Sequence, residues 1–196
     1  MEAAGLAGAG WIRRLTVAGL VAVLAACGPA RSPDEQLIRA VRQKDLPEVE
    51  RLLAAGANPN ADKVPGFEGR PALFHAAVFG YTDIAQELID KGANPDYGAA
   101  QGTVTPLMVA ALNGAASTVE LLIRSGAAVN ATAGRTTALT EATRRGYADV
   151  IALLLAARAD PNVPMDDGST PLCYAKRHGY AETMQLLRAA GARDDC

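Results

Sequence analysis

Residues 153–172 read LLLAARADPNVPMDDGSTPL, and this stretch decides the fold because it holds the end of one structural unit and the start of the next. Its leucine run is typical of the apolar side of a helix, and Asp160-Pro161-Asn162 is typical of the loop that follows. Thr170-Pro171-Leu172 offers a side-chain oxygen at a helix N-cap and a proline at the first helical position, where its missing N–H costs nothing. The stretch therefore predicts a helix, a loop and a second helix.

Two markers from this stretch recur along the chain with one shared period. The first is a leucine, at Leu37, Leu73, Leu107, Leu139 and Leu172. The second is a Gly-Ala pair or close variant, at Gly56-Ala57, Gly92-Ala93, Gly126-Ala127, Arg158-Ala159 and Gly191-Ala192, with Asn or Asp four residues after its first member. Both markers are separated by 36, 34, 32 and 33 residues. Two independent markers with the same separations predict five repeats.

Each repeat is expected to be a helical hairpin. The chain is 49% hydrophobic, mainly Ala and Leu, with only 5% aromatic residues, a composition that favours helices over sheets. Small pairs such as Ala110-Ala111 let neighbouring units approach closely, and glycines such as Gly114 and Gly146 mark the turn between two helices. One hairpin cannot bury its own apolar face, whereas five stacked hairpins can.

These five units resemble the ankyrin-repeat family over about residues 33–195. The resemblance implies an all-α solenoid of five helix-turn-helix repeats, at about residues 33–62, 63–97, 98–131, 132–163 and 164–196. Two departures stand out. The family often has histidine after the Thr-Pro-Leu triplet, but the five slots hold Ile38, Phe74, Met108, Thr140 and Cys173, so its loop hydrogen bonds are expected to be absent or replaced. Arg158 replaces a helix-ending glycine, which predicts a strained helix end in the fourth unit.

The N-terminal segment indicates export. Arg13 and Arg14 precede an apolar run of twelve residues, 15–26, which has the length of a signal-peptide core and is shorter than the ~20 residues that span a bilayer. Leu24-Ala25-Ala26-Cys27 resembles the lipobox of bacterial lipoproteins. The resemblance implies cleavage of residues 1–26, lipidation of Cys27 and a tether over 27–32. Gly28 after the cysteine implies a periplasmic protein on the outer rather than the inner membrane; an ordinary cleaved signal or an uncleaved anchor are the alternatives.

Catalytic, metal and cofactor motifs are not expected. The net charge of −2 argues against binding to nucleic acid, and removing residues 1–26 makes the remainder slightly more acidic. The histidines, His75 and His178, are about 100 residues apart without neighbouring metal-spaced ligands, so each is interpreted as a surface residue. We find no phosphate loop or nucleophile motif in the sequence. The sequence therefore predicts no enzyme, no metal site and no cofactor.

Two cysteines remain for the folded part. Cys173 lies near the start of the last inner helix and Cys196 follows the last outer helix, and these ends of an antiparallel hairpin are close in space. In an oxidising compartment this favours the hypothesis of a disulfide. The alternative is a buried Cys173 beside a frayed tail.

The family resemblance implies that protein partners bind the turn fingers and inner helices, which line a concave face. The residues that fall on this face are Phe67, Glu68, Arg70, His75, Phe79, Tyr81, Gln101, Val104, Asn113, Arg135, Glu141, Arg144, Arg145, Tyr147, Asp166, Asp167, Tyr174, Arg177 and Tyr180. The first finger, Asp62 to Arg70, is about three residues longer than usual, and its apolar tip over 64–67 is expected to be exposed. This makes the tip a contact candidate, and a tolerated insertion is the alternative. Tyrosines after the turn glycines have an alternative role in packing against the adjacent unit.

These observations favour a protein-binding module, monomeric without its partner. The leading hypothesis is a lipid-anchored periplasmic protein that holds or masks a partner, as an immunity or inhibitor protein for a toxin or secreted enzyme. The alternative is an adaptor that supports a periplasmic enzyme, for instance in oxidative-stress defence. An enzyme and a purely structural envelope protein are the rivals from other classes.

Overall fold

The computed structural model describes residues 31–67, 69–98, 101–194 and 196. Residues Ser32–Cys196 form one compact unit. Over the described ranges it contains ten α-helices and no strand, in five successive pairs. The pairs are α2 (Pro33–Arg42) with α3 (Leu46–Ala54), α4 (Ala72–Phe79) with α5 (Thr82–Asp90), α6 (Pro106–Leu112) with α7 (Ala116–Arg124), α8 (Ala138–Arg145) with α9 (Ala148–Ala156), and α10 (Pro171–His178) with α11 (Ala181–Ala189). The predicted all-α fold of five helix-turn-helix repeats is confirmed.

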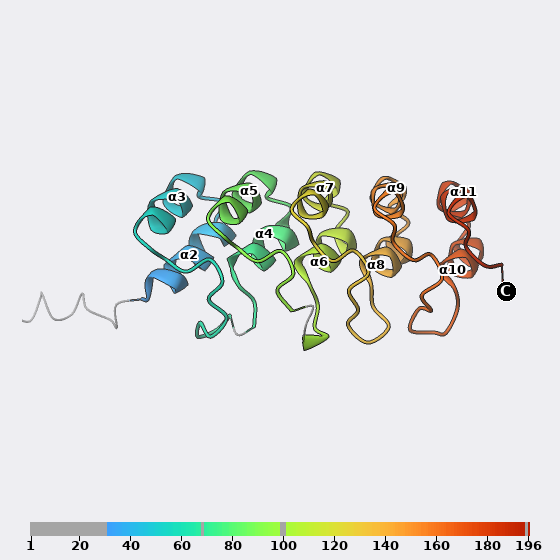
Figure 1. Ribbon diagram of the computed structural model, residues 1–196, viewed down its shortest axis with the longest axis horizontal. Coiled ribbons are helices and arrows are strands. Elements are labelled where there is room, and N and C mark those ends of the chain that lie inside the picture. The colour runs from blue at the N-terminus through green and yellow to red at the C-terminus, as the bar shows by residue number, and fades with distance from the viewer. Residues whose placement is uncertain (1–30, 68, 99–100, 195) are drawn as a thin grey trace, which may run out of the picture. The chain divides into compact units, whose positions relative to one another are not determined.

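The helices of this unit stack in two rows. Figure 1 shows the first helix of each pair in an inner row and the second in an outer row, with long loops extending from the side of the inner row. The recurring leucines lie between the rows and are at most 1% exposed. Burying one such side chain stabilises the fold by about 1.5–3 kcal/mol. The period seen in the sequence is therefore the period of the core.

Close stacking depends on small residues on the inner helices. Ala76, Ala77, Ala110 and Ala111 are fully buried, which lets α4, α6 and α8 pack side by side. None of the helices in the ranges above combines the length and the apolarity needed to cross a bilayer. The predicted signal peptide and Cys27 lie outside the described residues.

The recurring Asn or Asp ties each repeat to the next. Asn60 accepts a hydrogen bond from the backbone N–H of Asn94 at 2.7 Å and donates one to the carbonyl of Gly92 at 2.8 Å. In the third unit, Asn130 makes the same two contacts with the fourth unit: it accepts from the N–H of Asp160 and donates to the carbonyl of Arg158. Each such side chain satisfies backbone groups at the loop that follows an outer helix, which a helix end otherwise leaves without partners. This explains the second marker of the repeat.

Side-chain caps begin four of the five inner helices, including the predicted cap at Thr170, whereas α4 begins after Pro71 without one. The hydroxyls of Ser32, Thr105 and Thr170 accept hydrogen bonds from backbone N–H groups three residues later, and proline follows each of them. Thr137 and Thr140 form a capping box at α8, in which Thr140 occupies the family's histidine slot. The hydroxyl of Thr140 accepts from the N–H of Thr137 at 2.8 Å, so the loop bonds of histidine are replaced in this unit.

Among the residues that the structure describes, two that are not glycine adopt the left-handed conformation. Arg158 has φ 64°, as expected from its place in the glycine position of the fourth unit. Lys44 has φ 58°, at the position that Gly80 and Gly146 occupy in later units. The alignment that predicts a left-handed Arg158 applies equally to Lys44, although the sequence analysis did not identify it. A left-handed conformation costs an ordinary residue roughly 1 kcal/mol.

Candidate protein-binding surface

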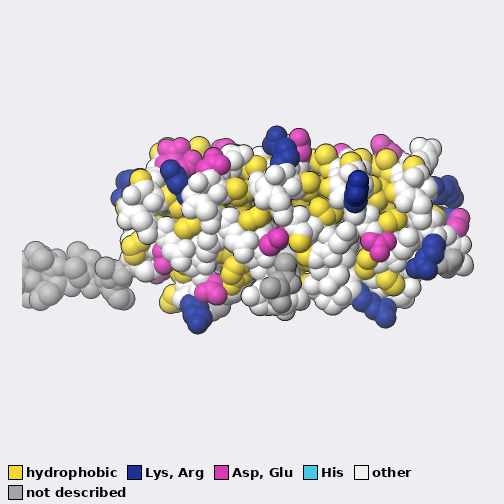
Figure 2. All heavy atoms as spheres, viewed as in Figure 1, with side chains coloured by type: hydrophobic (Ala, Val, Ile, Leu, Met, Phe, Trp, Pro, Cys, Tyr) yellow, Lys and Arg dark blue, Asp and Glu magenta, His cyan; other side chains and the backbone are white. Residues whose placement is uncertain are grey.

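The inner helices and the loops that precede them form one surface, which we call the inner face. The loops, or fingers, span residues 58–71, 94–105, 128–137 and 160–170. The five inner helices carry six Arg or Lys residues and three carboxylates, whereas the five outer helices carry three Arg or Lys residues and eight carboxylates. Figure 2 shows carboxylates gathered over α3, at one end of the outer row. The two sides of the repeat unit therefore differ in charge.

The two large apolar side chains at the tip of the first finger are buried, whereas Pro65 and Gly66 between them are exposed, so the expectation of an exposed apolar contact is wrong for Val64 and Phe67. Val64 is 4% exposed and Phe67 is 7% exposed. Phe67 turns onto α2, where the guanidinium groups of Arg39 and Arg42 lie 5.7 Å and 5.4 Å from its ring centre. The extra length of this finger lets the tip fold back over the first unit, and Phe67 becomes part of the core.

His75 is also buried, at 9% exposed, and the prediction of a surface histidine is wrong. Its ring meets Phe67 and Phe74 edge-on, at centroid distances of 5.6 Å and 6.1 Å. Burial, together with the nearby positive charges of Arg42 and Arg70, lowers the pKa of His75 to about 4. The side chain is therefore neutral at pH 7. Its Nε2 atom has no hydrogen-bond partner among the described residues.

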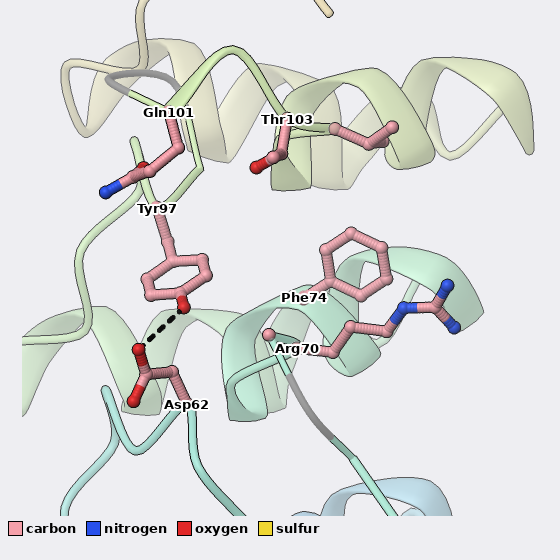
Figure 3. Close-up of a pocket in the computed structure, with 8 residues that line it drawn as sticks. Asp62, Arg70, Phe74, Tyr97, Gln101 and Thr103 are labelled. Carbon is pink, nitrogen blue, oxygen red and sulfur yellow. Dashed lines mark hydrogen bonds between the residues drawn. The ribbon is translucent and has the colours of Figure 1, made fainter.

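A groove of about 530 Å³ lies between the first two fingers (Figure 3). Tyr97 donates its hydroxyl to Asp62 across the groove at 3.1 Å, and burial raises the pKa of that phenol. The Arg70 guanidinium lies 5.5 Å from the ring centre of Phe74. Gln101 and Val104, both placed on this face from the sequence, line the groove. Asp62, Phe74 and Tyr97 were missed, because only the stacking of two units brings side chains from α4 and from both fingers to one groove.

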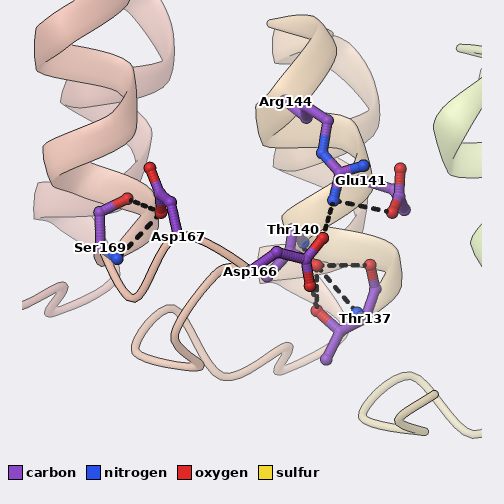
Figure 4. A network of polar contacts seen from close by, with 7 residues as sticks. All are labelled: Thr137, Thr140, Glu141, Arg144, Asp166, Asp167 and Ser169. Carbon is purple, nitrogen blue, oxygen red and sulfur yellow. Dashed lines mark hydrogen bonds and ion pairs between the residues drawn. The ribbon is translucent and has the colours of Figure 1, made fainter. Parts of the chain in front are cut away.

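A polar network occupies the inner face at α8 and the fourth finger (Figure 4). Arg144 contacts Glu141 at 3.3 Å and Asp166 at 2.9 Å. Glu141 is only 6% exposed, so it cannot offer its side chain to a partner as the sequence analysis proposed. Burial raises the pKa of Glu141, and its Oε2 atom lacks a hydrogen-bond partner. Arg144 therefore holds a costly buried carboxyl in place.

The last inner helix, α10, also carries an arginine that is paired with an aspartate of the finger before it. Asp167 accepts hydrogen bonds from the side chain and backbone of Ser169, and Arg177 contacts it at 3.0 Å. These contacts, the Ser169 bonds first, lower the pKa of Asp167 to about 2. Arg177 also lies 5.7 Å from the ring centre of Tyr174. Arg144 and Arg177 are thus each paired with an aspartate, whereas Arg135 and Arg145 in the same half of the inner face are exposed.

Tyrosines after the turns pack against the preceding unit. A Cβ added to Gly114 would lie 2.9–3.1 Å from ring atoms of Tyr147, and one added to Gly146 would lie 3.1–3.2 Å from Tyr180. In the second unit, Lys44 Nζ lies 5.2 Å from the ring centre of Tyr81. The packing alternative therefore accounts for these three tyrosines, and only part of each ring is open to a partner.

The other predicted contact residues lie at the surface. Phe79 is 44% exposed and stacks on Tyr81 at a centroid distance of 5.4 Å. The remaining exposed members are Arg70, Asn113, Arg135, Arg145, Asp166, Asp167 and Arg177, with Arg144 and Tyr174 partly exposed. Glu68 falls outside the described residues. The surface open to a partner is therefore mainly arginine, with one large aromatic side chain.

Cys173 and Cys196 are joined by a disulfide in the structure, with their Cα atoms 5.5 Å apart. Lys176 forms an ion pair with Asp194 beside it. The C-terminal tail is therefore held against α10. Over the described ranges no group of three or more His, Cys, Asp or Glu side chains is arranged to hold a metal ion.

The stacked hairpins, the side-chain ladder between them and the open inner face define a helical-repeat protein. The chain belongs to the ankyrin-repeat family: the family model described as "Ankyrin repeats (3 copies)" matches residues 37–133 and 131–195. Ankyrin repeats are protein–protein interaction modules, and the described part of the chain is one.

Curated relatives share the repeats. Ankyrin repeat and KH domain-containing protein mask-1 of Caenorhabditis elegans is 36% identical over 134 residues, covering 67% of this chain and 5% of that protein. Its counterpart named mask in Drosophila melanogaster is 37% identical over 104 residues, covering 52% and 3%. The transient receptor potential channel pyrexia of Drosophila melanogaster is 34% identical over 125 residues, covering 63% and 13%. This chain thus spans a small part of the length of the relatives it matches.

Proposed function

We propose that the chain is a lipid-anchored periplasmic protein whose inner face holds a partner protein. The observation that carries the proposal is the charge difference between the two rows of helices: the inner helices carry more Arg and Lys than carboxylates, the outer helices carry the reverse, and the fingers add carboxylates such as Asp166 and Asp167. A partner of complementary charge is attracted to one row rather than to the other. Arginine and large aromatic residues contribute most to interface energetics, and the inner face offers Arg70, Arg135, Arg145 and Phe79 to solvent.

The location rests on the N-terminal sequence. The apolar run over 15–26 and the lipobox at Leu24–Cys27 support cleavage and lipidation of Cys27, and the Gly at 28 supports the outer membrane. Two or more acyl chains anchor a protein stably, whereas one is marginal. The lipid would keep the repeats at the membrane surface, where an exported partner is met.

The preferred role is masking, in which the inner face covers a toxin or secreted enzyme and inhibits it, as an immunity protein does. An adaptor that supports a periplasmic enzyme, for instance in oxidative-stress defence, would use the same surface. The two roles differ in their effect on the partner: a masking protein abolishes its activity, whereas an adaptor leaves the activity intact or raises it.

The test is affinity purification of the tagged protein from its own cells after mild crosslinking. Replacing Arg135 and Arg145 with glutamate should release the partner, because both are exposed on the inner face. Arg124→Glu and Arg188→Glu, on outer helices, are the matched controls and should retain it. A partner kept by the inner-face variant would refute this surface.

Location is tested separately with Cys27→Ser. The wild-type protein should incorporate labelled palmitate and fractionate with the outer membrane, and the variant should do neither. Equal labelling of the two proteins would refute the lipid anchor and leave the binding surface unaffected.

A further inference from the structure

We propose that Arg42 and Arg70, on either side of His75, form a site for the carboxylate side chains of an acidic segment of the partner protein. This inference rests on the proposed function and specifies the chemistry of the partner. We call these three residues, with Phe67 and Phe74 beneath the arginines, the arginine-pair site.

The site is a row of stacked side chains across the first two units. Arg42 lies over Phe67 at 5.4 Å, and Arg70 lies over Phe74 at 5.5 Å. The His75 ring stands edge-on to both phenylalanines, between the two cation–aromatic pairs. Each guanidinium is therefore held by a buried ring while its side chain as a whole stays exposed.

Neither arginine has a carboxylate to neutralise it among the residues that the structure describes. Glu35 pairs with Arg39 at 2.9 Å, and Asp62 accepts the hydroxyl of Tyr97. In the C-terminal half of the inner face, Arg144, Lys176 and Arg177 each contact an aspartate, whereas Arg135 and Arg145 form no ion pair with a described residue. What distinguishes the N-terminal end is that its two unpaired arginines lie over neighbouring aromatic rings.

Two hollows accompany the arginines. The groove between the first fingers, about 530 Å³, is lined by Arg70 and Phe74, and a second hollow of about 330 Å³ is lined by Arg39, Arg42, Gln43 and Phe67. A guanidinium stacked on a ring keeps its N–H edges free for a bidentate bond to a carboxylate. The rings also restrict the arginine rotamers in advance, which lowers the entropy cost of binding.

His75 adds independent support. It is more than nine-tenths buried, and its Nε2 atom is without a partner. Burial first, and then the charges of Arg42 and Arg70, lower its pKa, so both guanidinium groups lie near the same ring. A carboxylate bound beside the two arginines would offset their positive charge at that ring.

An acidic polypeptide fits this site better than an anionic membrane surface. Adsorption to anionic lipid typically uses about four to eight basic residues on an open patch, each contributing about 1 kcal/mol. Here two basic residues flank the first finger, Arg42 on α2 and Arg70 near the end of the finger, and the outer helices of the first two units carry an excess of carboxylates that such a surface would repel. Arg42 and Arg70 each line a separate hollow, so they favour an extended polypeptide whose carboxylates are spaced along the chain.

The experiment measures fluorescence anisotropy of a labelled peptide in which glutamate alternates with serine and phenylalanine, titrated with the full chain in detergent. A matched peptide has glutamine in place of every glutamate. We expect the acidic peptide to bind and the glutamine peptide to bind at least about tenfold more weakly, since charge-assisted hydrogen bonds are about twice as strong as neutral ones. Arg42→Gln and Arg70→Gln should each weaken binding about tenfold, and added salt should weaken it further in the wild type than in the variants.

Arg124→Gln and Arg188→Gln on outer helices are the controls and should bind as the wild type does. Melting curves of all four variants show whether a loss of binding follows from unfolding. Equal binding of both peptides, or wild-type affinity in Arg42→Gln and Arg70→Gln, would overturn the site. Binding to phosphatidylglycerol vesicles that displaces the acidic peptide would overturn the assignment of the partner class.

The outcome is separable from that of the proposed function. If the natural partner is captured through the inner face and retained by Arg42→Gln and Arg70→Gln, the arginine-pair site is refuted and the binding function remains. If no partner is captured, the proposed function fails even where the peptide binds.

Discussion

Replacing Arg158 with glycine should stabilise the protein. Arg158 ends α9 with φ 64°, where the first, second, third and fifth units have glycine with φ between 82° and 90°. A Cβ built on any of those four glycines meets nothing within 4 Å, so the position is open and the cost of a side chain there is conformational. A left-handed backbone costs an L-residue about 1–2 kcal/mol, from which the greater freedom of glycine in the unfolded chain removes about 0.4–1 kcal/mol.

The net gain of Arg158→Gly is therefore about 1 kcal/mol. For a protein of this length, that corresponds to an increase in Tm of about 2–4 °C. The hydrogen bond from Asn130 is retained, because its acceptor is the backbone carbonyl of residue 158. Differential scanning calorimetry of the two proteins measures the difference directly.

Two control variants separate backbone strain from side-chain contacts. Arg158→Ala retains a Cβ in the left-handed conformation and should melt close to the wild type, since Arg158 is exposed. Gly126→Arg places the same strain in the third unit and should lower Tm by a similar amount. If Arg158→Gly lowers Tm and Arg158→Ala lowers it equally, the arginine side chain makes a stabilising contact, and the strain argument is refuted.

Three further predictions follow from packing and ionisation. Gly114→Ala should destabilise more than Gly126→Ala in chemical denaturation, because only the first clashes with a tyrosine ring; equal losses would contradict that packing. Glu141→Gln should raise Tm at pH 7, because burial raises the pKa of the Glu141 carboxyl and its ionisation destabilises the fold as pH rises through that pKa. The variant should lose this advantage over the wild type below the ordinary pKa of 4.5. A lower Tm of the variant at pH 7 would show that the contact with Arg144 outweighs the cost of burial. The free energy of unfolding should fall by up to about 3 kcal/mol as pH drops from 6.5 to 4. In this range His75 of the unfolded chain binds a proton, whereas His75 of the folded protein, with its pKa near 4, does not. If His75→Gln shows the same fall, the effect belongs to another group.

The disulfide between Cys173 and Cys196 leads to a further prediction. It closes a loop of 23 residues, so its reduction should destabilise the last unit by about 3 kcal/mol on the chain-entropy model. Intact mass after alkylation, with and without reductant, reports the bond, and two thiols in the native protein would contradict it.

The repeats were predictable because their determinants are local and periodic. A threonine before proline caps its own helix, and a leucine at a fixed position is buried whenever a neighbour stacks on it. The left-handed conformation of Arg158 followed in the same way, from its alignment with four glycines. None of these properties depends on which side chains of adjacent repeats meet on the inner face.

The details of the binding surface were less predictable. Phe67 looked exposed because an apolar residue in a long finger has no assigned neighbour in the sequence, and the ring is in fact covered by arginines from α2. Glu141 is a charged residue on an inner helix, yet it is buried with Arg144 beside it. Such outcomes depend on contacts between units, which the repeat period does not specify.

The sequence by itself determined the number of units, the helical hairpin in each, and the caps and turns that join them, because these depend on neighbours within one period. Only the tertiary structure decided which inner-face side chains are open to a partner. It turned the first finger onto α2, buried His75 between two phenylalanines and left Arg42 and Arg70 uncompensated among the described residues. The physical reason is that burial and charge compensation are set by side chains from adjacent repeats, whose approach is fixed only when the hairpins stack.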